Sequence, residues 1–214
     1  MRFRDRVDAG GALGRRLREE PLDDPVVLGL PRGGVVVAAG VADALAAPLD
    51  IVVARKLGVP WQPELAFGAV APGVIALRDD VIGASGLGRS DIDAAAARES
   101  AKLAELATRY RGDLAAVPLG GRTAIVVDDG LATGATATAA VRSVRHHQPK
   151  HLIVAVPVCA APTAAELRRE VDGVVCLGEY QDFHAVGRYY DDFGSVSDDA
   201  VRELVARSRR APLL

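Results

Sequence analysis

Two adjacent acids, Asp128 and Asp129, end an apolar run and stand directly before the small and hydroxyl-bearing segment GLATGAT. A Gly/Thr turn that opens a helix leaves backbone N–H groups free at the positive end of the helix dipole, which favours a bound phosphate. Thr133 and Thr136 add hydroxyl donors. The two carboxylates repel phosphate but accept hydrogen bonds from sugar hydroxyls. The segment therefore predicts a site for a sugar phosphate.

Other phosphate motifs do not fit this segment. A Walker loop needs GxxxxGK[ST], which the sequence lacks, and no GxGxxG fingerprint follows a strand. The nearest approach, GASGLG at 83–88, is expected to be a loop. If residues 128–130 are considered by themselves, a turn that caps the following helix is the alternative interpretation. The TGAT that follows and the apolar run that precedes make the ligand-binding interpretation the stronger one.

The elements that must position these residues follow from an alternation of apolar runs, Gly-rich turns and Ala-rich stretches. Runs rich in β-branched residues predict strands buried on both faces, as in a parallel sheet, at 26–30, 49–54, 123–127, 151–158 and 173–178. Helices are expected at 4–20, 35–46, 91–111, 135–147, 162–171 and 198–209. This pattern predicts an α/β fold with a doubly wound, mainly parallel five-stranded sheet.

We expect one domain over 1–214. Within it, 57–112 form an insertion of a hairpin and a long helix, a small hood or lid. The net charge of −2 shows no basic excess, so no nucleic-acid partner is expected. Two cysteines in apolar surroundings indicate reduced, buried thiols. The charged N-terminus is unlike a signal peptide, and the apolar stretch 33–54 contains charged residues and a proline, so a cytoplasmic protein without a membrane partner is expected.

Unusual segments stand at the ends of four predicted strands: PRGG at 31–34, Arg55-Lys56, DDGLATGAT at 128–136, and EYQDFHAVGRYY at 179–190. In open α/β sheets, ligands bind outside the carboxyl ends of the strands. We therefore expect these segments to converge in space, although they lie far apart in the sequence.

The residues at these strand ends carry a family resemblance. IVVDDGLATGAT resembles the phosphoribosyl-diphosphate (PRPP) signature of type I phosphoribosyltransferases. LPRGG resembles the diphosphate loop of that family, ARKLG its basic stretch, and ELAFG at 64–68 the return to the sheet after its mobile loop. Order and spacing match over about 25–195. The chain also resembles a subgroup of stand-alone phosphoribosyltransferases with undefined acceptors.

The resemblance implies a role for each matched residue. Asp128 and Asp129 would bind the ribose hydroxyls, and Arg32 with the Gly33-Gly34 backbone would hold diphosphate, with Arg55 and Lys56 nearby. The 5-phosphate would lie in the loop of Gly130, Leu131, Ala132, Thr133, Gly134, Ala135 and Thr136. The catalytic residues would be Asp128, Asp129, Lys56 and Arg32. The resemblance further implies that the peptide bond between Pro31 and Arg32 is cis, with an ordinary trans turn as the alternative.

The implied reaction moves the 5-phosphoribosyl group from PRPP to a nitrogenous acceptor and releases diphosphate. Cations and N–H groups aimed at the diphosphate would stabilise the charge that builds there. Mg²⁺ would be held mainly by ligand oxygens and water, without direct protein ligands. A homodimer is a further expectation.

The acceptor is expected on the 179–197 segment, where Phe183, Tyr189 and Tyr190 are candidates for stacking on a base. A hydrophobic cluster that anchors the tail is the equal alternative. The family's mobile loop is reduced here to GVPWQP at 58–63. This shortening favours a second hypothesis, a non-catalytic regulator that senses PRPP or a nucleotide. A structural module that binds a sugar phosphate is the third.

Overall fold

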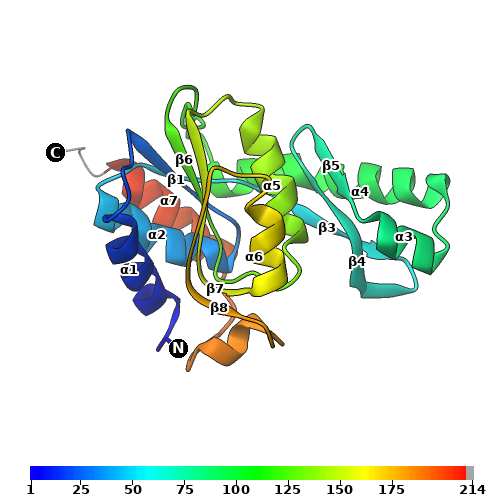
Figure 1. Ribbon diagram of the computed structural model, residues 1–214. Coiled ribbons are helices and arrows are strands. Elements are labelled where there is room, and N and C mark those ends of the chain that lie inside the picture. The colour runs from blue at the N-terminus through cyan, green and yellow to red at the C-terminus, as the bar shows by residue number, and fades with distance from the viewer. Residues whose placement is uncertain (211–214) are drawn as a thin grey trace.

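The central sheet of the protein has five strands in the order β2-β1-β6-β7-β8, and every pair is parallel (Figure 1). The structure is a computed structural model and describes residues 1–210 of the chain. The strands are β1 (Pro25–Gly29), β2 (Leu49–Ile51), β6 (Thr123–Val127), β7 (His151–Ala160) and β8 (Gly173–Tyr180). The predicted fold class, a doubly wound parallel sheet, is confirmed.

Helices cover both faces of this sheet (Figure 1). One face carries α1 (Arg6–Leu17), α2 (Gly33–Leu45) and α7 (Asp198–Arg210), and the other carries α5 (Ala135–Arg145) and α6 (Ala161–Leu167). Because neighbouring side chains of a strand point to opposite faces, successive residues enter different cores. Val27 and Ile125 pack toward α1 and α2, whereas Val26 and Val126 pack toward α5 and α6. Burial on both faces explains why these strands are continuous apolar runs.

A second sheet lies beside the first and is antiparallel, in the order β3-β4-β5. Its strands are β3 (Arg55–Val59), β4 (Gln62–Ala71) and β5 (Val74–Leu77), followed by α3 (Asp79–Ser85) and α4 (Arg89–Arg111). The expected hairpin and long helix are therefore present. Figure 1 shows this sheet and α3 to the right of α5.

Two local predictions were wrong. The run 49–54 is not one strand, because β2 ends at Ile51, level with the last residue of its partner β1. Arg55 and Lys56 consequently begin β3 of the second sheet instead of ending a central strand. The segment 83–88 is not a loop throughout, since its first residues close α3 and Gly86, with a φ of 65°, forms the left-handed cap.

The long helix α4 is fastened to the central sheet at its end. Arg111 Nε donates to Asp50 Oδ1 at 2.8 Å, and the backbone N–H of Val117 donates to Asp50 Oδ2 at 2.8 Å. Asp50 is buried in β2, so these bonds supply the partners that a buried carboxylate requires. The insertion is thereby held at a fixed place beside the strand ends.

The chain reaches the last helix through a short 3₁₀ helix, η1 (Val186–Tyr189), that follows β8. Cys159 and Cys176 are free thiols on neighbouring strands, the first buried and the second half-buried. Among residues 1–210, no helix combines the length and the apolar character that crossing a membrane requires.

Candidate functional site

The loops that follow β1 and β6 meet at the carboxyl edge of the sheet. Their strands pair along their full length, ending at Gly29 opposite Val127. A Cβ on Gly33 would lie 2.0 Å from Asp129 Oδ2, and one on Gly34 would lie 2.8 Å from the carbonyl oxygen of Val127. At Gly34 the obstructing atoms are backbone, so only glycine fits there, whereas at Gly33 a Cβ would displace the Asp129 carboxylate. The PRGG segment and the acidic pair are therefore packed in direct contact.

Arg32 and Arg55 line a cavity of about 300 Å³ together with Tyr110 and Asp198. The peptide bond between Pro31 and Arg32 is cis, as the resemblance implied. The Arg32 side chain is half exposed, and its Nη1 lies 3.8 Å from Asp198 Oδ1. The second sheet thus brings a cation from β3 to the same cavity as the first loop.

Arg55 forms an ion pair with Glu99, an acid that the sequence analysis did not single out. Its Nε donates to Glu99 Oε2 at 2.5 Å, and Lys102 Nζ donates to Glu99 Oε1 at 2.9 Å. Burial alone would raise the pKa of Glu99, but the bonds from Lys102 and Arg55 outweigh it and lower the pKa from 4.5 to about 2. Glu99 therefore stays ionised at neutral pH and fixes the Arg55 guanidinium.

Asp129 has a partner from the N-terminal helix. Arg6 Nε donates to Asp129 Oδ2 at 2.7 Å, and the two side chains are only 12% and 15% exposed. The Arg6 guanidinium lies 3.8 Å above the centre of the Phe193 ring, and its Nη1 donates to the carbonyl oxygen of Gly194 at 2.8 Å. Sequence reasoning missed Arg6, because a charge in RFRDR looks like any solvated charge near a helix start.

The acidic pair is poorly solvated. Burial raises the pKa of Asp128 well above its usual value, and the neighbouring Asp129 carboxylate raises it further. A hydrogen bond from the Asp129 N–H at 2.8 Å and the charges of Lys56 and Arg6 act in the opposite direction. Burial also raises the pKa of Asp129, against the effect of Arg6. Lys56 is exposed and close enough to act on the charge of Asp128, as expected of a residue at this edge.

The predicted phosphate loop is held by its backbone. The Leu131 N–H donates to Val158 O at 3.0 Å, and Leu131 O accepts from Ala160 N at 2.9 Å. Thr163 Oγ1 donates to Ala132 O at 2.6 Å. Gly134, with a φ of 69°, caps α5 at its N-terminus. The loop is therefore shaped before any ligand arrives.

Free donors remain at the start of α5. Within residues 1–210, the backbone N–H groups of Thr133, Gly134, Ala135 and Thr136 donate no hydrogen bond. Thr133 is exposed and Thr136 is half-buried. Unpaired N–H groups at the positive end of a helix dipole are the chemistry that a phosphate requires.

The three aromatic candidates belong to one hydrophobic cluster, in which Phe183 and Tyr189 pack against the buried Tyr190 and Phe3. Tyr190 is buried, and its hydroxyl donates to the Asp129 carbonyl oxygen at 2.6 Å. Its ring contacts Phe3 at a centroid distance of 5.8 Å. Phe183 and Tyr189 are partly exposed and stack on each other, with centroids 5.1 Å apart. Tyr190 thus supports the backbone of the acidic pair, and Phe183 with Tyr189 of η1 forms the partly exposed part of the same cluster.

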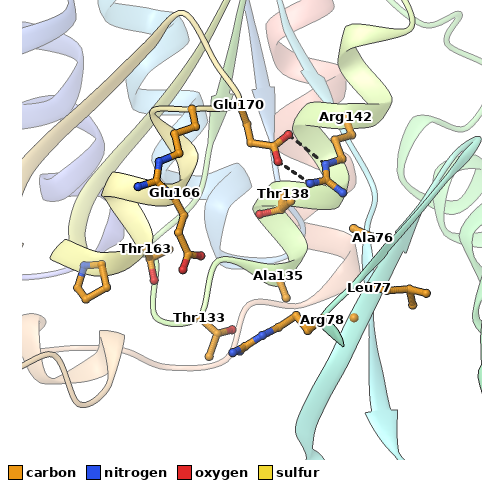
Figure 2. A pocket seen from close by; sticks show the side chains of 13 residues that line it. Ala76, Leu77, Arg78, Thr133, Ala135, Thr138, Arg142, Thr163, Glu166 and Glu170 are labelled. Atoms are coloured by element: carbon orange, nitrogen blue, oxygen red, sulfur yellow. Dashed lines mark hydrogen bonds and ion pairs between the residues drawn. The ribbon is translucent and has the colours of Figure 1, made fainter. Parts of the chain in front are cut away.

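A cleft of about 450 Å³, which no sequence pattern predicted, lies between the β4–β5 hairpin, α5 and the segment around α6 (Figure 2). Thr133 and Ala135 of the phosphate loop line it, and so does Arg78 at the end of β5. Arg142 and Glu170 form a two-pronged ion pair on its wall. The cleft is therefore continuous with the phosphate loop and bears charged side chains.

The architecture defines the class as an α/β protein with a doubly wound parallel sheet, and comparisons with known proteins show what the chain is similar to. No family model matches the chain. Proteins from two strains of Mycobacterium tuberculosis, each named "putative phosphoribosyl transferase", are 46% identical over 209 residues, which is 97% of this chain. The chain spans about half, 47%, of the length of these curated relatives.

Two solved structures extend the comparison. The crystal structure of TT1426 from Thermus thermophilus shares 43% identity and a TM-score of 0.82, covering 97% of this chain and 99% of that one. The AQ2163 protein from Aquifex aeolicus, at 11% identity and a TM-score of 0.52, covers 85% of this chain and 76% of that one and shares the fold alone. Over nearly its whole length, the chain is thus similar to proteins named "putative phosphoribosyl transferase" and to TT1426.

Proposed function

We propose that the protein transfers the 5-phosphoribosyl group from PRPP to a nitrogenous acceptor and releases diphosphate. The observation that carries this proposal is the direct contact of the Gly33-Gly34 backbone with the acidic pair, beside a loop with four free N–H groups. One edge of the sheet thus offers separate surfaces for a diphosphate, for ribose hydroxyls and for a phosphate. The name carried by the mycobacterial relatives supports the same activity.

Each surface has a role in the proposed reaction. Asp128 and Asp129 accept hydrogen bonds from the ribose hydroxyls, and the N–H groups of 133–136 hold the 5-phosphate. Arg32, Arg55 and Lys56 lie on the diphosphate side. The acceptor nitrogen forms a bond to ribose C1 while the C1–O bond to diphosphate breaks, and diphosphate leaves with that electron pair. Cations fixed in advance stabilise this leaving charge.

Mg²⁺ would lie near the carboxylates of Asp128 and Asp129 and would offset the charge of the leaving diphosphate. Among residues 1–210, no group of three His, Cys, Asp or Glu side chains is arranged to hold a metal. Mg²⁺ commonly keeps several waters and binds through substrate phosphates with one or two carboxylates. We propose that diphosphate and ribose oxygens hold most of the ion, with the carboxylates of Asp128 and Asp129 nearby.

A second candidate function is a PRPP or nucleotide sensor without turnover. The observation that favours it is the tight connection between β3 and β4, where Pro60 and Trp61 alone join the strands. A long mobile loop that could cover the ligand is therefore missing between Lys56 and β4. Phe183 and Tyr189 would contact the acceptor in the enzyme and the base of a nucleotide in the sensor.

One experiment separates these functions. The purified protein is incubated with PRPP and Mg²⁺ and with purines, pyrimidines or other heteroaromatic amines, and diphosphate is measured. Release that depends on one acceptor supports the transferase. Calorimetric binding of PRPP without release for any acceptor supports the sensor. If PRPP fails to stabilise or bind the protein, both proposals fall. Asp128→Asn is the matched control that lacks one proposed ribose contact.

The domain organisation, the cellular location and the oligomeric state of the protein are also proposals. We propose that 1–214 act as one unit in the cytoplasm, with 57–112 as a hood beside the site and 179–197 as its acceptor side. A homodimer remains a proposal, and sedimentation of the purified protein tests it. The net charge of −2 supports small-molecule partners over nucleic acid.

A further inference from the structure

The loop proposed to hold the 5-phosphate contains no cation. Residues 130–138 read GLATGATAT, without Lys or Arg. The first basic residue of α5, Arg142, is engaged by Glu170. A phosphate monoester carries about 1.5 to 2 negative charges at pH 7, whereas the end of a helix dipole supplies roughly half a positive charge. Much of the ligand's charge would stay unbalanced if the loop acted alone.

The cleft beside the loop contains the guanidinium of Arg78, which points toward the loop. Figure 2 shows the Arg78 side chain extending from the hairpin toward Thr133 and Ala135, and all three residues line the cleft. The base of Arg78 is fixed, because its N–H donates to the Phe67 carbonyl oxygen at 2.9 Å. A cation anchored in the second sheet thus faces the phosphate loop of the first.

The Arg78 guanidinium is available to a ligand. Its side-chain partner within the described part of the chain is Asp80, with Nη2 to Oδ2 at 2.8 Å, and the Asp80 side chain is 67% exposed. An exposed pair of this kind is worth roughly 0–1 kcal/mol, so a phosphate can replace the carboxylate. The planar fork of arginine matches phosphate oxygens in a bidentate way.

The other charged groups of the cleft do not take this place. Arg142 is neutralised by Glu170 on the cleft wall. Glu166 lies with Thr163 on the α6 side, and Arg169 follows α6 (Figure 2). The Glu166 carboxylate repels an anion on the α6 side of the cleft, which leaves the side beside Arg78 as the favourable position.

We propose that Arg78 binds the 5-phosphate together with the N–H groups of the loop and so selects 5-phosphorylated ribose; this inference rests on the proposed function. The phosphate lies between Thr133 and the guanidinium, and Arg78 exchanges its bond to Asp80 for one to the ligand.

The test compares PRPP with two ligands that each carry one of its ends: ribose 5-phosphate has the 5-phosphate end, and diphosphate has the other. Affinities of the wild-type protein and Arg78→Gln are measured by calorimetry for ribose 5-phosphate, for PRPP with Mg²⁺ and for diphosphate with Mg²⁺. We expect Arg78→Gln to lose about tenfold in affinity for the first two, as for one charge-assisted pair at a half-exposed site, and to bind diphosphate unchanged. Arg78→Lys should recover part of the loss, because it restores the charge without the fork.

Arg169→Gln is the matched control, since it removes a guanidinium that lines the same cleft but follows α6 instead of the β4–β5 hairpin. It should bind all three ligands like the wild type. Equal affinity of Arg78→Gln and wild type for ribose 5-phosphate would overturn the inference, and so would an equal loss for diphosphate. If wild-type protein binds ribose 5-phosphate but not PRPP, the proposed function fails while the role of Arg78 is still measured. If the wild-type protein binds neither ribose 5-phosphate nor PRPP, both the inference on Arg78 and the proposed function fail.

Discussion

Replacing Asp128 by Asn should stabilise the unliganded protein while it removes a ligand contact. The pKa of Asp128 is raised by burial and by the Asp129 carboxylate. The pKa of this acid is higher in the folded chain than the value of 3.8 that it has in the unfolded chain. The protonated acid therefore favours folding, and this contribution to stability is complete below pH 3.8. This contribution is lost as the pH rises through the folded pKa, because the carboxylate must then ionise where it is poorly solvated. At neutral pH and above, the charge of Asp128 therefore works against the fold.

The Asn variant keeps the one bond that the structure assigns to the side chain. Oδ1 still accepts from the Asp129 N–H, which lies 2.8 Å away. Removal of an unfavourable charge at a functional site commonly gives about 0.5–2 kcal/mol of stability. For a domain of this size, each kcal/mol moves Tm by about 2–4 °C, so Asp128→Asn should melt roughly 1–8 °C above the wild type.

Asp129 gives the matched contrast, because its removal leaves a cation unpaired, although burial raises the pKa of Asp129 as well. Asp129→Asn leaves the Arg6 guanidinium, 12% exposed, without its carboxylate partner. Breaking a fully buried pair costs about 3–5 kcal/mol, and the partial exposure here brings the expected loss to about 2 kcal/mol. The same chemical change at adjacent positions is thus expected to have opposite signs.

Thermal unfolding between pH 5 and 9, with and without PRPP and Mg²⁺, measures both effects. The advantage of Asp128→Asn over the wild type should grow as the pH rises, and PRPP should stabilise both variants less than the wild type. The reasoning is refuted if Asp128→Asn is less stable than the wild type across this range, or if both variants move in the same direction.

Three further outcomes are expected. Gly33→Ala should weaken PRPP binding, because a Cβ would lie 2.0 Å from Asp129 Oδ2 and displace that carboxylate; unchanged calorimetric binding would contradict this packing. Tyr190→Phe should cost about 1 kcal/mol in a denaturant titration, since only the bond to the Asp129 carbonyl oxygen is lost; a neutral result would mean that water replaces the hydroxyl. Glu99 has its pKa lowered to about 2, so its contribution is present above 4.5 and lost as the pH falls toward 2. Glu99→Gln should therefore flatten the acid limb of the stability curve followed by circular dichroism, and an unchanged limb would exclude Glu99 as its source.

The sequence was sufficient for features that depend on short segments. The apolar runs of the parallel strands are recognisable because both of their faces are buried. The segments at 31–34 and 128–136 are recognisable because glycine is required where backbones meet and small residues where a helix opens. The convergence of these two segments follows from strand pairing at one edge of the sheet.

The features that the sequence did not predict depend on contacts between residues that lie far apart in the sequence. The end of β2 at Ile51 is set by the length of β1, which the run 49–54 does not contain. Arg6 lies against Asp129 only because α1 packs beside the carboxyl edge. The direction of Arg78 depends on how the second sheet sits against α5. Charge patterns in one sequence do not distinguish such residues from solvated ones.

The segment from Tyr189 to Gly194 is joined to the first residues of the chain. Phe3 pairs with the backbone of 189–191, and Arg6 bonds to Gly194, a contact that spans 188 residues. Contacts of such long sequence separation carry the largest loop-closure entropy and form late in folding. During synthesis, the sheet and the phosphate loop can therefore assemble first, and the site remains open on one side until the segment around Phe193 has emerged. Because the last contacts to form are commonly among the first to open, hydrogen exchange should be fastest where the two ends meet.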